Sequence, residues 1–278
     1  MKKTKYAINK TLIYIFLILL AVICIIPFWL MIVNSTRSGV EISRSFSLLF
    51  GNNLKENWEQ LFDYFNLFKG MFNSLLVSIP ATLLNVYFSA LCAYGLVMYE
   101  FRGNRLLTIV IIVFMMIPQQ LGLIGFYNLV SNLGLIDSYV PLIIPSIASC
   151  GTVFFLRQYL ISSYPRAIAE SARIDGASEF YSFNKLAIPI MGPALATMGI
   201  MAFIGSWNNY LTPMIILNDT EKFTLPVMMG TLHAATDLQK NQGAIYLAVS
   251  ISVIPILLVF VFASKYIIGG VSAGAVKG

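Results

Sequence analysis

Charged residues are scarce in this chain, and their scarcity excludes an ordinary water-soluble globule. Only 11% of the 278 residues are charged, whereas 58% are hydrophobic; a typical soluble domain carries about 25% charged residues. The mean hydropathy is +0.79. Long uncharged stretches alternate with short charged ones, which is typical of a chain that crosses a lipid bilayer several times.

Histidine and cysteine are also rare, which excludes most catalytic and metal-binding chemistry. The single histidine, His233, lies in a loop, so neither a paired-histidine zinc site nor a Ser-His-Asp site has the residues it needs. Cys24, Cys92 and Cys150 lie in three different apolar runs and indicate neither a disulfide framework nor a metal site. The sequence therefore predicts no catalytic residue, no metal ligand and no enzyme activity on this chain.

A phosphate-binding loop is absent as well. No Gly-x-x-x-x-Gly-Lys-Ser/Thr pattern occurs, and glycine is nowhere followed directly by lysine. The apolar runs also lack the buried Asp, Glu, Lys or Arg that ion-coupled transporters use. We therefore expect no cofactor on this chain, and any ATP to be hydrolysed on a separate protein.

Six apolar runs approach or exceed the roughly 20 residues that a helix needs to cross a bilayer. We predict an all-α integral membrane protein, a single permease-like domain over 1–278, with spans at about 12–33, 71–97, 106–130, 138–157, 186–212 and 243–265. The fourth span is the shortest and requires Arg157 to extend its charged end to the membrane interface. Pro118 is expected to kink the third span, because proline cannot donate the helical hydrogen bond.

The basic residues predict the orientation of the chain. With both termini in the cytoplasm, most of the 18 basic residues lie inside, as the positive-inside rule requires. The inside residues are Lys2, Lys3, Lys5, Lys10, Arg102, Arg105, Arg157, Arg166, Arg173, Lys185, Lys265 and Lys277. The net charge of +6 is then a signal of topology, and no nucleic-acid partner is needed to explain it.

The segment 164–185, between the fourth and fifth spans, is cytoplasmic in this topology. Pro165 suits a first helical turn with Ser163 as its cap, and Glu170 is placed to pair with Arg173 three residues later. Gly176 permits a left-handed turn. The residues predict helix, glycine break and helix lying flat at the membrane surface, either as a docking site for another protein or as an ordinary connecting loop.

This segment resembles the signature loop of the permeases of binding-protein-dependent ABC importers. The matching residues are Glu170-Ser171-Ala172, Gly176 and, after nine further residues, Leu186-Ala187-Ile188-Pro189. In that family the loop is the coupling helix, which seats in a cleft of the ATP-hydrolysing subunit. The resemblance assigns ATPase coupling to Glu170, Ser171, Ala172, Asp175, Gly176, Ala177 and Pro189.

Further motifs are similar to the carbohydrate branch of that family, in particular to the smaller maltose-type permease. They are Arg173–Ser178, Met116–Pro118 and Trp207–Pro213. The resemblance implies a sugar importer, with an oligosaccharide as the preferred substrate, in a bacterial-type inner or plasma membrane. It also implies the partners: a second permease subunit, a dimer of ATP-binding subunits that hold ATP and Mg, an extracytoplasmic sugar-binding protein, and membrane lipid.

Uncharged polar residues inside the spans are candidates for the substrate path. Amides and aromatic rings suit sugar hydroxyls and sugar faces, and these types occur at Gln119, Trp207, Asn208, Asn209 and Tyr210. Asn73, Asn85 and Gln120 are further amides in the spans. Hydrogen bonding between helices explains such residues equally well.

Three other functions stay open from the sequence. The chain could serve an ABC importer of a non-sugar solute. It could be a self-contained channel or secondary transporter, although no paired halves are visible. It could also be a membrane scaffold that only recruits a cytoplasmic partner through the loop 164–185.

Overall fold

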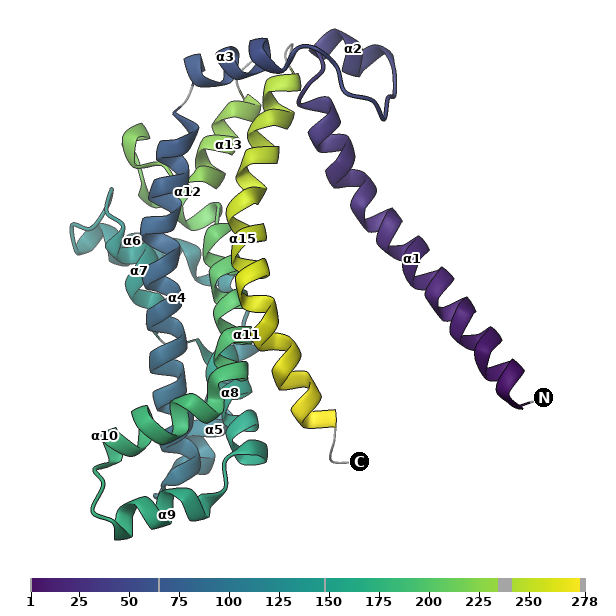
Figure 1. The fold of residues 1–278 in the computed structure, drawn as a ribbon. Helices are drawn as coiled ribbons and strands as arrows, with labels where there is room; N and C mark the ends of the chain where they lie inside the picture. Colours follow the sequence, from purple (N-terminus) through teal and green to yellow (C-terminus); the bar gives the residue numbers. More distant parts are fainter. Residues whose placement is uncertain (1, 65, 148, 235–241, 276–278) are drawn as a thin grey trace. The chain divides into compact units, whose positions relative to one another are not determined.

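The computed structural model describes residues 2–64, 66–147, 149–234 and 242–275, and every regular element within them is a helix (Figure 1). Five helical segments are long and apolar enough to cross a membrane, and a bent pair of helices makes a sixth if the pair is counted as one span. They are Lys10–Asn34, Leu67–Met98, Val140–Ser163, Glu179–Trp207 and Gln242–Phe262, with the bent pair Asn104–Met115 and Gln120–Asn132. The predicted all-α membrane fold is confirmed.

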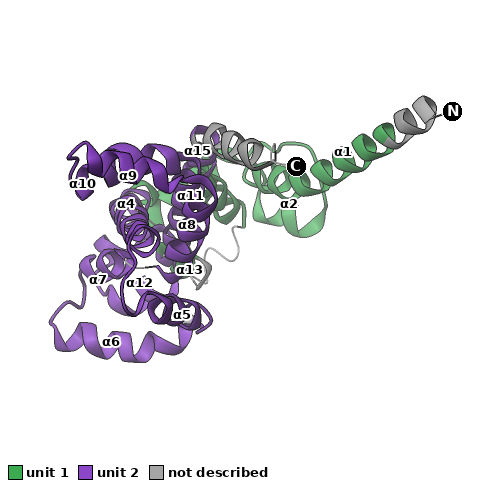
Figure 2. Ribbon diagram, turned by 90° about the horizontal axis from the view of Figure 1, so that it is seen from below, with its two compact units in different colours: residues 1–68, 228–254 green, residues 69–227, 255–278 purple. Residues whose placement is uncertain are grey.

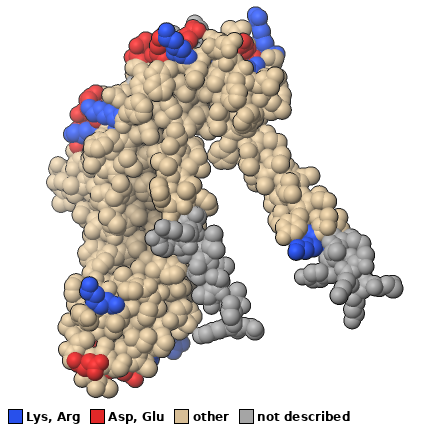
Figure 3. All heavy atoms as spheres, viewed as in Figure 1, with Lys and Arg blue, Asp and Glu red and all other residues tan. Residues whose placement is uncertain are grey.

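Long helices form most of the spans. They are α1 (Lys2–Asn34), α4 (Leu67–Met98), α8 (Cys150–Ser163), α11 (Ile188–Trp207) and α15 (Gln242–Ala275). The shorter helices are α2 (Gly39–Arg44), α3 (Leu54–Tyr64), α5 (Asn104–Met115), α6 (Leu123–Asn132), α7 (Val140–Ile143), α9 (Arg166–Ile174), α10 (Glu179–Ser182), α12 (Leu211–Ile216) and α13 (Leu225–Ala234). Figure 3 shows the charged side chains near the helix ends, with uncharged surface along the helices, as a membrane environment requires.

The chain divides into two compact units, coloured separately in Figure 2. The first comprises residues 1–68 and 228–254. Its α1 is apolar on all sides, and none of its membrane window is buried within the chain. The buried Asn57 of α3 organises this unit, since its Nδ2 donates to the carbonyl oxygens of Ser35 and Arg37 at 2.8 and 3.0 Å. Gly243 lies directly against Arg37 and Asn57.

The second unit comprises residues 69–227 and 255–278 and contains the broken third span. The sequence predicts a kinked helix over 106–130, and the structure has a larger break. Helix α5 ends at Met115, Pro118 adopts an extended backbone, and the two arms are bent by 84°. Proline lacks the N–H that would continue the helix and disfavours the helical conformation of the residue before it, so the chain turns there.

Candidate functional site

The predicted docking loop begins with α9, which spans Arg166–Ile174. Pro165 is its N-cap, whereas Ser163 is the last residue of α8, so the predicted serine cap is wrong. The reason is local: Tyr164 and Pro165 both adopt extended backbone angles, which separates the two helices. Proline fits this first position because the N–H that it lacks would have no helical partner there.

Gly176 ends α9 in a left-handed turn, with φ +77°. The N–H of Gly176 donates to the Arg173 carbonyl at 3.1 Å, and the N–H of Ala177 donates to the Ala172 carbonyl at 2.9 Å. This bond pattern is a Schellman motif, which satisfies the last carbonyls of a helix. The turn therefore requires the positive φ that the sequence predicted for glycine.

Arg173 pairs with a different carboxylate from the one expected. Its Nε donates to Glu179 Oε1 at 2.6 Å, and its guanidinium lies over the ring of Tyr99, 5.4 Å from the centroid. The predicted pair with Glu170 is therefore wrong, because the turn at Gly176 brings α10 back against α9. The pKa of Tyr99 is raised, first by burial and then by the hydrogen bond and negative charge of Glu179.

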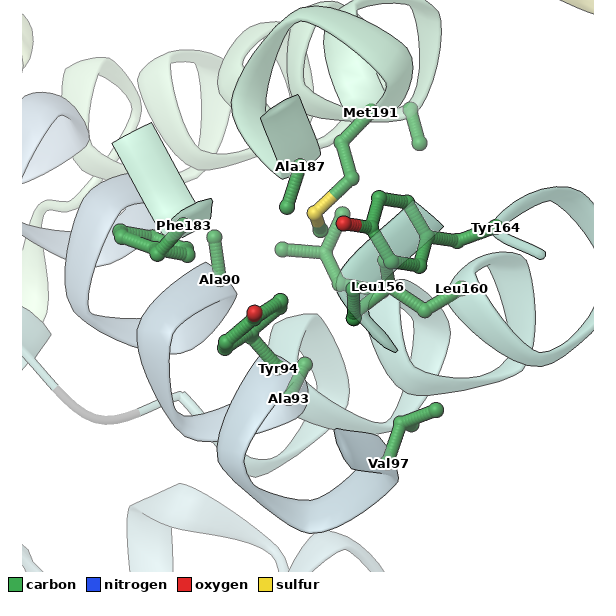
Figure 4. Close-up of a cluster of buried hydrophobic side chains, with 12 residues drawn as sticks. Ala90, Ala93, Tyr94, Val97, Leu156, Leu160, Tyr164, Phe183, Ala187 and Met191 are labelled. Atoms are coloured by element: carbon green, nitrogen blue, oxygen red, sulfur yellow. The ribbon is translucent and has the colours of Figure 1, made fainter. Parts of the chain in front are cut away.

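A buried cluster lies between α9 and the membrane helices (Figure 4). Tyr94 of α4, Tyr164 and Phe183 are each less than 5% exposed. The ring of Tyr94 lies 6.3 Å from that of Tyr164 and 5.4 Å from that of Phe183, at edge-on or tilted angles that aromatic pairs favour. Ala169 of α9 belongs to the same cluster. The loop and the cytoplasm-facing ends predicted for α4, α8 and α11 are thus packed as one body.

The opposite side of the loop is exposed and partly apolar. Ile174 is 86% exposed, Phe180 66% and Tyr181 54%. We call these three residues the apolar loop patch. Among the residues predicted to couple to an ATPase, Glu170, Ser171, Asp175 and Gly176 are exposed beside the patch, and Ala177 is half-buried. Ala172 is buried on the inner side of α9, so it packs against the protein and not toward solvent.

Pro189 lies at the start of α11, where the chain changes helix type. The preceding turn, Phe183–Ala187, is a π-helix in which the N–H of Ile188 donates to the Phe183 carbonyl. Pro189 has no N–H to give to the carbonyl four residues earlier, and a widened turn accommodates that loss. Pro189 is exposed and at a distance along the chain from α9, so its position favours a role in joining the loop to the fifth span.

A cavity of about 690 Å³ lies within the second unit, between the broken third span and helices α4, α8, α11 and α12. Its polar lining consists of Asn85, Ser146, Ser149, Ser206, Asn209 and Thr212. Phe114 and Phe126 contribute aromatic surface from the two arms of the bent span. The bend at Pro118 therefore leaves a space whose mostly apolar lining is interrupted by hydroxyl and amide groups.

Only part of the predicted substrate path lines this cavity. Asn209 does; Asn208 and Tyr210 flank the break between α11 and α12 but are not in the lining. Trp207 is 2% exposed and its ring stacks on Phe203, so it belongs to the core. The side chain of Gln119 lies outside the described residues.

The sequence drew attention to Asn85 and missed the serines of the lining. Serine is common in membrane helices, so single serines give no signal. A pattern on α4 marks only the face that carries Asn85: Ser78, Thr82, Asn85 and Ser89 recur every three or four residues and share that face. Their side-chain oxygens are buried without hydrogen-bond partners among the described residues.

A second polar network joins the loop before α7 to the loop after α12. Asp137, at φ +61°, accepts hydrogen bonds from the backbone N–H groups of Asn218 and Asp219, both at 3.0 Å, and from Lys222 Nζ at 2.7 Å. These bonds, that of Lys222 above all, lower the pKa of Asp137 to about 2. This network could not be predicted from the sequence, because the partners are about 80 residues apart and are charged residues of a kind usual in loops.

Comparison with known proteins identifies the family. The family described as "Binding-protein-dependent transport system inner membrane component" matches residues 85–272. The arabinooligosaccharides transport system permease protein AraQ of Bacillus subtilis is 32% identical, with 99% of this chain and 98% of that protein covered. The diacetylchitobiose uptake system permease protein NgcG of Streptomyces coelicolor is 31% identical, over 94% of this chain and 87% of that protein.

The fold also matches a solved structure. A bacterial ABC transporter involved in the import of the acidic polysaccharide alginate contains a chain that superposes with a TM-score of 0.79 at 23% identity, covering 93% of this chain and 96% of that one. The matched region of the family includes α9, Gly176, Pro189 and most of the cavity lining. This chain belongs to the family of binding-protein-dependent transport system inner membrane components, and it is a multi-pass permease of the ABC transporter type.

Proposed function

We propose that this chain is one of two membrane-spanning subunits of an ATP-driven importer of oligosaccharides. The proposal rests on the cavity of about 690 Å³ with its six hydroxyl and amide side chains. Ligand sites of this kind have volumes of about 300–1,000 Å³ and a few placed polar groups among apolar ones. The names of the relatives, which refer to arabinooligosaccharides and diacetylchitobiose, support a carbohydrate substrate.

The chemistry of the lining suits a sugar. Sugar hydroxyls both donate and accept hydrogen bonds, as do the serine, threonine and asparagine side chains of the cavity. The apolar faces of a sugar ring fit against aromatic rings, which Phe114 and Phe126 supply. An ion would need charged groups or a dense set of carbonyls, and none of the residues lining this cavity is charged.

ATP hydrolysis is assigned to a separate dimer of ATP-binding subunits, which hold ATP and Mg²⁺ and dock against the apolar loop patch. In this assembly α9 faces the cytoplasm, as do both termini. Transport requires the docked loop to differ in free energy between the inward- and outward-open states, since a partner that binds both equally shifts nothing. The cluster of Tyr94, Tyr164 and Phe183 supports this assignment, because movement of α9 is carried directly to three membrane helices.

The remaining partners follow from the same assignment. A second permease subunit supplies the other half of the path, and an extracytoplasmic binding protein delivers the sugar to the outer loops. Glu170, Ser171 and Asp175 contribute the polar contacts to the ATPase, and Gly176 holds the turn that follows α9. Ala172 acts by close packing beneath α9, and Ala177 and Pro189 shape the links to the neighbouring helices.

The neighbours Asn208 and Asn209 provide a matched test of the sugar path, because only Asn209 lines the cavity. Asn209→Ala and Asn85→Ala each remove a cavity side chain, and we expect the half-saturating sugar concentration for stimulated ATP hydrolysis to rise about two- to twelvefold, the equivalent of one hydrogen bond. Asn208→Ala changes the same residue type one position away and outside the cavity, so its kinetics should match the unaltered complex. Equal kinetics in all three variants would remove the cavity from the sugar path.

Purification in mild detergent tests the assembly. We expect an ATPase and a second multi-span protein to accompany this chain. Sugar flux in liposomes that contain this chain alone would instead favour a self-contained channel or secondary transporter. Binding of the ATPase without any flux in the full assembly would favour a scaffold, and flux of a solute other than a sugar would refute the substrate class.

A further inference from the structure

A second pocket, with a volume of about 450 Å³, lies beside the first turn of α5 and the C-terminal half of α8. Two arginines line it, Arg105 from α5 and Arg157 from α8. Arg105 is the second residue of α5 and Arg157 lies at the middle of α8, and the two helices pack against each other. The packing of these two helices brings both charges to one pocket.

Arg157 shows that the pocket is more than a solvated basic surface. Its Nε is screened from solvent and has no hydrogen-bond partner among the described residues. A buried donor without a partner is costly, and a charged donor more so. An arginine that merely extended to water would keep this N–H hydrated as well, so the buried Nε favours an acceptor within the pocket.

The electrostatics of the pocket favour an anion. Glu100 is the acidic residue of the lining, and its Oε1 is paired with Arg166 at 3.1 Å. Gly103, the N-cap of α5, has no side chain to cap the first turn, so the positive end of the helix dipole adds to the two arginines. Three arginines and one glutamate leave a net positive site.

Apolar surface surrounds the charged part of the pocket. Phe101 is 44% exposed and Ile109 is 48% exposed, and both line it; Leu106, next to Arg105, is 64% exposed. A small soluble anion would leave this apolar surface in water, whereas an anionic lipid presents both a phosphate and acyl chains. Basic pockets between membrane helices are known to take lipid head groups.

We propose that Arg105 and Arg157 bind the phosphate of an anionic phospholipid, with its acyl chains along Phe101, Leu106 and Ile109. The site joins the loop that carries Glu100, and so α9, to the lipid. That the lipid belongs to the cytoplasmic leaflet rests on the proposed function, whereas the chemistry of the site does not.

Native mass spectrometry of the purified, delipidated transporter tests this inference. Phosphatidylglycerol and phosphatidylcholine are added back separately, and bound lipid is counted on the complex. We expect phosphatidylglycerol to bind more tightly, by roughly fivefold for each arginine, the equivalent of about 1 kcal/mol. Equal binding of the two lipids by the unaltered protein would overturn the proposal without any variant.

Variants locate the site. Arg105→Gln and Arg157→Gln should each weaken phosphatidylglycerol binding roughly fivefold. Arg102→Gln removes an exposed arginine at the same end that does not line the pocket, and it should change nothing. Unchanged lipid retention in both pocket variants, or equal loss in Arg102→Gln, would refute the assignment.

A soluble competitor separates the two sources of phosphate. Glycerol 3-phosphate has the same phosphate without acyl chains, and it should not displace the lipid at comparable concentration. Displacement would make this a site for a soluble anion and would overturn the lipid proposal. The same spectra show whether ATPase subunits are attached, so a failure of the proposed function is seen separately from a failure of the lipid site.

Discussion

Substitution of Gly176 isolates the contribution of one backbone angle to coupling. The residue adopts φ +77°, and a Cβ built there meets no heavy atom within 4 Å. A side chain at this position therefore creates no clash, and its effect is confined to backbone strain. Few positions in a protein separate these two effects so cleanly.

The magnitude follows from the cost of the left-handed conformation, about 1–2 kcal/mol for a residue with a Cβ. A free loop can relax away from this angle, whereas a docked loop must hold it. Gly176→Ala should therefore weaken ATPase docking by about five- to thirtyfold. Gly176→Val should be worse, since branched residues resist positive φ most, and Gly176→Asn should be mildest because asparagine tolerates it.

Two measurements check this prediction: the affinity of the purified ATPase for the permease assembly, and sugar-stimulated ATP hydrolysis in proteoliposomes. Gly103→Ala is the matched control. Gly103 has φ +100° with open space around it, and it caps α5 outside the loop 164–185. It should lose a similar amount of local stability and leave docking unchanged.

The reasoning fails under two outcomes. Docking and stimulated hydrolysis that both survive in Gly176→Val would show that the turn geometry is not used for coupling. An equal loss of docking in Gly103→Ala would show that strain anywhere at this end of the protein is enough, and that the loop has no special role.

Three further predictions concern the remaining contacts. The lowered pKa of Asp137 means that its contribution to stability is present above its ordinary pKa of 3.8 and is lost as pH falls toward 2. Hydrogen exchange of the amides in 218–222, corrected for intrinsic rates, should therefore show protection that falls over this pH range in the unaltered protein. In Asp137→Asn the protection should not change over the same range. Tyr94→Phe should leave the thermal unfolding temperature unchanged or slightly raised, because the buried hydroxyl has no partner among the described residues. Tyr94→Ala should lower the free energy of unfolding by about 3–5 kcal/mol. A clear loss of stability in the Phe variant would reveal a partner for the hydroxyl. Gly243→Ala should lower the unfolding temperature in detergent, since its Cβ would overlap a backbone carbonyl and a buried asparagine, whereas Gly95→Ala meets nothing within 4 Å and should not.

The sequence by itself determined that this protein lies in a membrane and where along the chain its signature loop, 164–185, is found. Six apolar runs require a membrane, because the backbone of each can satisfy its hydrogen bonds only as a helix in lipid. Gly176 and Pro118 acted through their own backbones, at a left-handed turn and at a helix break, and such local effects are readable without tertiary structure.

Tertiary structure alone decided which side chains meet. The sequence paired Arg173 with Glu170, its helical neighbour, but the chain reversal at Gly176 gave it Glu179 and Tyr99. Five residues were predicted for the sugar path, but the bend at Pro118 determined where the cavity formed; among the four whose side chains the structure describes, Asn209 lines it and the other three do not. Arg105 and Arg157, which line one pocket, and Asp137 and Lys222, which form an ion pair, come from segments far apart along the chain. Their proximity depends on how helices pack, and a periodic apolar pattern specifies which face is apolar but not which neighbour covers it.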